Sequence, residues 1–216
     1  MQIVIVLIII SAVLLSQVFA KAWDAKRFES IKSWAIGKGL EAFYSLPRSD
    51  AEKLFWFDVA KKGASSTTRF VVVAETNTTR ICVFEQRFTS QSGKNNSTKN
   101  AVITMVQDRR INAPSASIVP RRFLSSLSKL IGATYIEFPD VPEFNQKFMV
   151  RGKSEESIRA FLKSTVLSKL ASIPPMEIGF HEDTLVLVNW DTKLQAAEIE
   201  SYMRKGLEVL SMCRTV

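Results

Sequence analysis

The sequence is poor in the residues from which most catalytic and metal sites are built. It contains one histidine and two cysteines in 216 residues. It has no Cys-x-x-Cys pair and no Cys or His pair at ligand spacing, which argues against a zinc site. It also lacks the G-x-S-x-G turn of serine hydrolases and the G-x-x-x-x-G-K-[ST] phosphate loop. We therefore predict no catalytic residue, no metal ligand and no cofactor.

Two weak candidates for chemistry remain. A Ser-His-acid triad would have to use His181, but the alternation in "GFHED" places this residue at the polar end of a strand, so we expect a solvated histidine. Glu137, Asp140 and Glu143 lie close enough in sequence to bind a cation, although acidic loop residues are usually solvated.

Charge is absent from residues 1–20, "MQIVIVLIIISAVLLSQVFA". Because about 20 residues at about 1.5 Å each cross the roughly 30 Å core of a bilayer, we predict a transmembrane anchor that contacts membrane lipid. Lys21, Lys26 and Arg27 follow it, which favours a single-pass protein with its soluble domain in the cytoplasm. The alternative is a signal peptide cleaved after Ala20, with the domain exported.

Residues 21–216 carry the whole formal net charge of +8. The basic residues form separate pairs instead of one block, so we favour a solvated surface over binding to anionic lipid or nucleic acid. The pairs are Lys61-Lys62, Arg109-Arg110 and Arg121-Arg122. Arg80 and Arg87 alternate with aromatic residues in "RICVFEQRF" and could contact single-stranded nucleic acid, but no RNP-like motif supports this partner.

The remaining pattern predicts one α+β domain over residues 21–216, with mainly antiparallel strands packed with helices. A helix should follow the anchor and end near Gly37. A short helix from Ser49 should place Leu54, Phe55 and Phe57 in the core. The three segments "RFVVVAE", "RICVFEQRFT" and "NAVITMVQD" predict a β meander, with a mobile loop at residues 90–99. "RRFLSSLSKLIG" then predicts a helix.

The second half of the domain is expected to alternate strands and helices. "EFNQKFMVRG", residues 143–152, predicts one strand that buries Phe144, Gln146, Phe148 and Val150 on one face. Ser154 should cap the next helix. A hairpin from "MEIGFHED" and "TLVLVNW" follows, and a last helix should bury Ile199, Met203, Gly206, Leu210 and Cys213. Cys82 and Cys213 are expected in the core, and a disulfide between them would require an exported domain.

This order of elements resembles a group of uncharacterised bacterial membrane-anchored proteins over most of residues 27–213. The likeness lies in Phe144-Asn145, Phe148, Val150 and the hairpin "MEIGFHEDTLVLVNW". The chain departs from that group in having one hydrophobic span where some members have two. The resemblance implies no established activity, so it assigns no site residue.

From these observations we predict a non-enzymatic, membrane-anchored interaction or scaffold domain with an unidentified protein partner. Two alternatives stay open: a membrane-tethered enzyme with a site built from scattered residues, and a basic peripheral binder of anionic lipid or nucleic acid.

Overall fold

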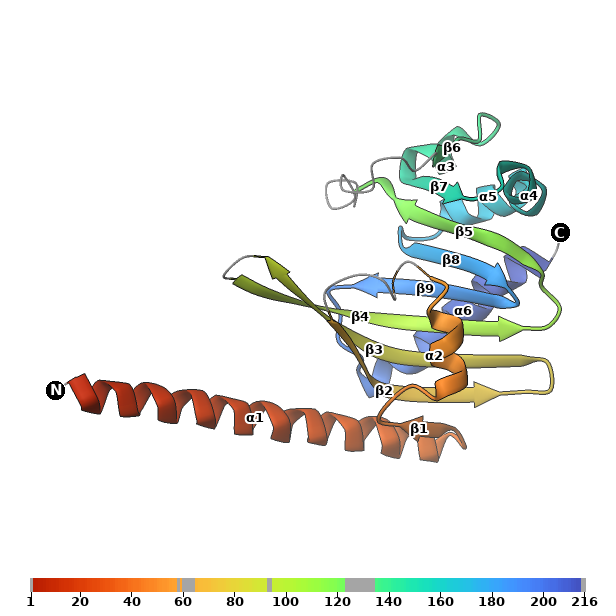
Figure 1. Cartoon of the computed structure of the whole chain (residues 1–216). Coiled ribbons are helices and arrows are strands. Elements are labelled where there is room, and N and C mark those ends of the chain that lie inside the picture. The colour runs from red at the N-terminus through yellow and green to blue at the C-terminus, as the bar shows by residue number, and fades with distance from the viewer. Residues whose placement is uncertain (1, 58, 60–64, 93–94, 123–134, 215–216) are drawn as a thin grey trace.

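A computed structural model describes residues 2–57, 59, 65–92, 95–122 and 135–214. Within these ranges, nine strands form one antiparallel sheet with the order β1-β2-β3-β4-β9-β8-β5-β7-β6 (Figure 1). The strands are β1 (Glu41–Phe43), β2 (Ser65–Glu75), β3 (Thr79–Ser92), β4 (Asn95–Asp108), β5 (Ala113–Pro120), β6 (Tyr135–Ile136), β7 (Phe148–Gly152), β8 (Glu177–Glu182) and β9 (Thr184–Trp190). The helices are α1 (Gln2–Gly37), α2 (Arg48–Leu54), α3 (Pro142–Lys147), α4 (Glu155–Phe161), α5 (Ser164–Ser172), the 3-10 turn η3 (Ala196–Glu198) and α6 (Ile199–Arg214).

The sheet is covered on both faces, which explains the nearly continuous apolar runs of its central strands. On one face, Val83 and Val102 belong to a buried cluster that also includes residues of the second half of α1, of α4 and α5, and of α6. On the other face, Phe84 and Ile103 pack with Leu54 of α2 and with the segment that follows it. Figure 1 shows α2 and α6 on opposite sides of the sheet. The predicted α+β domain with a three-stranded meander is confirmed.

The predicted transmembrane anchor over residues 1–20 is wrong for the described part of the chain. No helix there combines the length and the apolar content needed to cross a bilayer. The helix also does not stop near residue 20, because α1 continues without a break for 36 residues to Gly37. This finding removes the basis for a single-pass membrane protein and for the orientation that we derived from Lys21, Lys26 and Arg27.

Arg27 has a different role from the one its position after the apolar run suggested. It is buried, and its Nη2 donates to Oε2 of Glu85 at 2.7 Å. Arg69 donates to the other oxygen of Glu85 at 2.9 Å and to Asp24 of α1 at 2.6 Å. Both guanidinium groups also lie over the ring of Phe70. These contacts attach α1 to β2 and β3 through buried charge, since Glu85 has no exposed side-chain surface.

The segment at residues 143–152 differs from the predicted single strand. Pro142 occupies the first turn of α3, where its fixed φ suits a helix, and the strand β7 begins only at Phe148. Phe144 and Phe148 are both buried and their rings stack with centroids 5.3 Å apart, while Gln146 is exposed. The apolar residues thus reach the core as expected, but by a helix followed by a strand.

Of the other local predictions, some are confirmed and others are wrong. Ser154 caps α4, accepting a hydrogen bond from the amide of Ser157, as predicted. Leu54 and Phe57 are buried, but Phe55 is 66% exposed and does not belong to the core. β3 and β4 continue through most of the predicted loop at 90–99, pairing Ser90 with Ser97. The helix expected at "RRFLSSLSKLIG" falls largely on residues 123–134, outside the described ranges.

Candidate functional site

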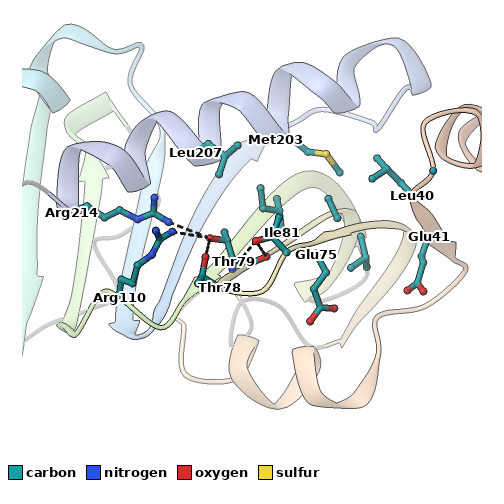
Figure 2. A pocket seen from close by; sticks show the side chains of 14 residues that line it. Leu40, Glu41, Glu75, Thr78, Thr79, Ile81, Arg110, Met203, Leu207 and Arg214 are labelled. Atoms are coloured by element: carbon teal, nitrogen blue, oxygen red, sulfur yellow. Dashed lines mark hydrogen bonds between the residues drawn. The ribbon is translucent and has the colours of Figure 1, made fainter.

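A groove of about 640 Å³ lies between α6 and the neighbouring ends of β2 and β3 (Figure 2). Its floor is made by the buried Ile81 of β3 and by Ala74, which is the partner of Ile81 on β2. Met203 and Leu207 of α6 form one wall, and Leu40, in the connection from α1 to β1, closes the far end. The volume falls within the range of roughly 300–1,000 Å³ that is usual for small-molecule sites.

The apolar part of the groove wall is aliphatic, and threonine, glutamate and arginine side chains complete the lining. The described residues that line it include leucine, isoleucine, valine, alanine and methionine but no phenylalanine, tyrosine or tryptophan. Leu207 is 43% exposed, although leucine on a packed helix normally faces a core. The surface therefore suits a flexible aliphatic group, and it offers no aromatic face on which a nucleobase could stack.

The position of α6 depends on a glycine. The face of α6 that packs on the sheet includes Ile199, Gly206, Leu210 and Cys213, as the sequence predicted, whereas Met203 is only half-buried. A Cβ atom at Gly206 would lie 2.8 Å from Val106 and 2.9 Å from Thr104. The missing side chain lets α6 approach β4 closely, which leaves Met203 and Leu207 above the ends of β2 and β3.

The other end of the groove is basic. Arg110, from the connection after β4, and Arg214, in the last turn of α6, point toward the hydroxyl of Thr79 (Figure 2). Both also bind the carboxylate of Asp108, whose side chain has no exposed surface. Arg110 donates to Asp108 through Nε and Nη2 at 2.9 Å each, and Thr79 donates to it at 2.5 Å.

This arrangement strongly favours the charged form of Asp108. The hydrogen bond from the Arg110 side chain holds the pKa of the Asp108 carboxyl well below its usual range, with Thr79 and Arg214 adding to the effect against the opposing influence of burial. The carboxylate of Asp108 is therefore the ion-pair partner of two guanidinium groups. The cluster carries a surplus positive charge, and it faces the aliphatic groove.

A second, polar hollow of about 230 Å³ adjoins the basic end and shares Thr78 and Thr79 with the groove. Three cations line it: Lys53 lies 2.6 Å from Asp183, Arg80 lies 3.0 Å from the buried Asp50, and Arg109 is the third. These ion pairs connect α2 to the ends of β3 and β8. All of the described residues that line the hollow are polar or charged, so it offers less to an aliphatic ligand than the groove does.

His181 is only partly solvated, which differs from the prediction. Its Nδ1 lies 2.6 Å from Oγ of Ser115, and its ring stacks on Trp56 with centroids 4.9 Å apart. The nearby acid, Glu182, is exposed and lies 3.9 Å from Nε2. In a catalytic triad the serine meets Nε2 and a buried acid orients Nδ1, so this arrangement is reversed and lacks the buried acid.

The remaining candidates do not assemble into a site. In the part of the chain that the structure describes, no group of three or more His, Cys, Asp or Glu side chains could hold a metal ion. Arg80 is paired with Asp50, and the two aromatic residues of this segment, Phe84 and Phe88, are buried, so the segment offers no stacking surface. Cys82 and Cys213 are free and lie in the cores on opposite faces of the sheet, where burial raises the pKa of each thiol to about 12.

The sequence did not reveal the groove. Arg110 was noted only as half of a basic pair, and Met203 only as part of a buried helix face. The one usable indication was Leu207, which lies outside the predicted buried face of the last helix. Arg214 and Asp108 are 106 residues apart, and no local pattern connects them.

The fold belongs to the α+β class, with one large antiparallel sheet between helical layers. A search of family models found no match, and no curated protein sequence matches the chain. Among solved structures, the crystal structure of the mycobacterial trehalose monomycolate transport factor A is similar, with a TM-score of 0.56 over 86% of this chain and 94% of the other. The two chains are 11% identical, so the likeness concerns the fold alone.

Proposed function

We propose that this domain is a non-enzymatic binding domain that holds the aliphatic part of a lipid in the groove beneath α6. The observation that carries the proposal is the aliphatic lining of the groove, above all the exposed Leu207 beside Met203 over a buried floor. Burial of this surface by an alkyl chain would contribute about 25 cal/mol for each Å² of apolar area removed from water. A chain of a dozen carbons can therefore bind without a strong polar anchor.

The likeness to a trehalose monomycolate transport factor is compatible with this role. It supports a binding or carrier function within the class of interaction domains that the sequence favoured. It does not identify the lipid, because two chains with 11% identity share few side chains. The protein partner predicted from sequence also stays a proposal. A domain that carries a lipid gives one physical reason for such a partner, because the lipid must be transferred to the domain and from it to another molecule.

The proposal is tested by filling the groove. Met203→Trp should place an indole ring in the space for the alkyl chain and lower the affinity for a fluorescent polyene fatty acid at least tenfold. Ser201→Trp is the matched control, because Ser201 is exposed on the same helix and does not line the groove. Titrations should use the full-length chain without alkyl detergent, which would compete for the groove.

Unchanged affinity in Met203→Trp, with the variant folded as judged by circular dichroism, would show that the probe binds elsewhere. Equal loss in both tryptophan variants would point to a general disturbance of α6 and would also contradict the proposal.

A further inference from the structure

The basic end of the groove points to selection of the ligand's head group. Resting on the function proposed above, we infer that the domain prefers an aliphatic ligand with an anionic head, which Arg110 and Arg214 bind while the tail lies along Ile81, Met203 and Leu207. The ligand class is a single-tailed carboxylate or phosphate amphiphile. Figure 2 shows the two guanidinium groups at one end of the apolar lining and Leu40 at the other.

The charge balance supports an anion at this position. Arg110 and Arg214 share the single carboxylate of Asp108, which leaves one positive charge uncompensated within the cluster. The C-terminal end of α6 contributes a partial negative charge of about half a unit, which weakens the surplus without cancelling it. The acids on the groove rim, Glu41 and Glu75, lie away from the arginines (Figure 2).

Hydrogen-bond donors also remain for a ligand. Arg214 uses only Nη2 in its contacts with Thr79 and Asp108, and Arg110 uses Nε and Nη2. Within the described part of the chain, Nη1 of Arg110 and both Nη1 and Nε of Arg214 have no hydrogen-bond partner, so they can donate to an incoming carboxylate or phosphate. The two side chains keep 51% and 30% of their surface exposed, so a ligand can reach them. Asp108 and Thr79 hold them in place beforehand, which lowers the ordering cost of binding.

The arrangement also fixes the direction of the ligand. A head group at the Arg110 and Arg214 end requires the tail to run toward Leu40, over Ile81 and beneath Met203. An inverted ligand would place its charge against aliphatic side chains, which is unfavourable for an ion without partners.

The inference is tested by comparing ligands that share one tail. The full-length chain should bind dodecanoate and dodecyl phosphate at least tenfold more tightly than dodecanol, and it should bind inorganic phosphate or acetate much more weakly than either amphiphile. The single variants R110Q and R214Q each leave Asp108 one guanidinium partner and remove the surplus positive charge. In each, the affinity for both anions should fall to near that for dodecanol, while dodecanol binding stays unchanged. Unchanged dodecanol binding also shows that the groove is intact.

The matched control is R48Q or R159Q, each of which removes the same charge from an exposed ion pair outside the groove, Arg48 with Glu52 or Arg159 with Glu155. It should keep the preference for anions. Equal binding of dodecanol and dodecanoate by the unmodified chain would overturn the head-group inference and leave the proposed function standing. Binding of no amphiphile would refute the proposed function itself, and tight binding of inorganic phosphate alone would mean an anion site without a role for the tail.

Discussion

Single buried polar side chains hold distant parts of this protein together. Glu85 joins α1 to the sheet through Arg27 and Arg69, and Asp108 joins the end of β4 to the end of α6 through Arg214. Each carboxylate has lost its contact with water and has gained two guanidinium partners. Such groups are costly to leave unpaired, so their effect on stability should be visible one residue at a time.

Asp108→Asn should make the free energy of unfolding less dependent on pH in the acidic range. Because the pKa of Asp108 is lowered by Arg110 in the folded chain, its charged form stabilises the fold above the unfolded pKa of about 3.9. This contribution is full at pH 7 and is lost as the pH falls from about 5 toward the folded pKa. Urea unfolding should therefore show a less stable variant at pH 7 and a smaller difference at pH 3.

The exposed Asp140→Asn provides the comparison, and it should follow the unmodified chain at both pH values. A difference between Asp108→Asn and the unmodified chain that is the same at pH 7 and pH 3 would show that Asp108 is not ion-paired in solution.

Phe148→Ala should lower the free energy of unfolding by about 3–5 kcal/mol, because it removes a fully buried ring stacked on Phe144. Met149→Ala should cost distinctly less, since Met149 is only half-buried at the next position of β7. Chemical denaturation of the two variants measures the contrast. Equal losses of unfolding free energy would mean that Phe148 and Met149 do not differ in burial as described.

At the level of the elements, α6 both packs on the sheet and forms the wall of the groove. Gly206→Ala should destabilise the chain by about 1–3 kcal/mol, because the added methyl group meets Val106 and Thr104 closer than carbon atoms normally approach. Alanine favours a helix over glycine by about 1 kcal/mol, so a loss of stability would show that packing dominates.

Gly37→Ala is the control for this substitution. Gly37 ends α1, and a Cβ atom there would meet nothing within 4 Å. Its thermal unfolding midpoint should stay the same or rise slightly. If Gly206→Ala raised the midpoint as well, the close approach of α6 to β4 would be disproved.

The elements that the sequence predicted correctly are those with a strong local pattern. The hairpin of β8 and β9, the cap at Ser154 and the buried face of α6 all follow from spacing within about 20 residues. The segment at residues 143–152 was predicted as one strand because its apolar residues alternate, and Pro142 was not considered as the start of a helix. The anchor was predicted from the apolar span at residues 1–20 alone. That prediction did not take account of the remainder of α1, whose charged residues contact the sheet.

At the scale of the whole molecule, the candidate site depends on contacts that no local pattern contains. Arg214 meets Asp108 across 106 residues, and Met203 approaches Ile81 only because β2 and β3 lie beside α6 in the folded sheet. The sequence predicted a non-enzymatic, membrane-anchored interaction or scaffold domain without an evident active site, and the described part of the chain does not support the anchor. The fold adds a place for a ligand, lined by aliphatic side chains and ending at two arginines.

The most direct test is to find where a bound alkyl chain lies. A dodecanoate analogue with a diazirine at the end of its tail should, on irradiation, label the peptides that contain Leu40 and Met203, and excess dodecanoate should suppress the labelling. Mass spectrometry of the digested full-length chain identifies the labelled residues. Labelling confined to the exposed Phe55 and Trp56, or spread over the surface without competition, would contradict lipid binding in the groove.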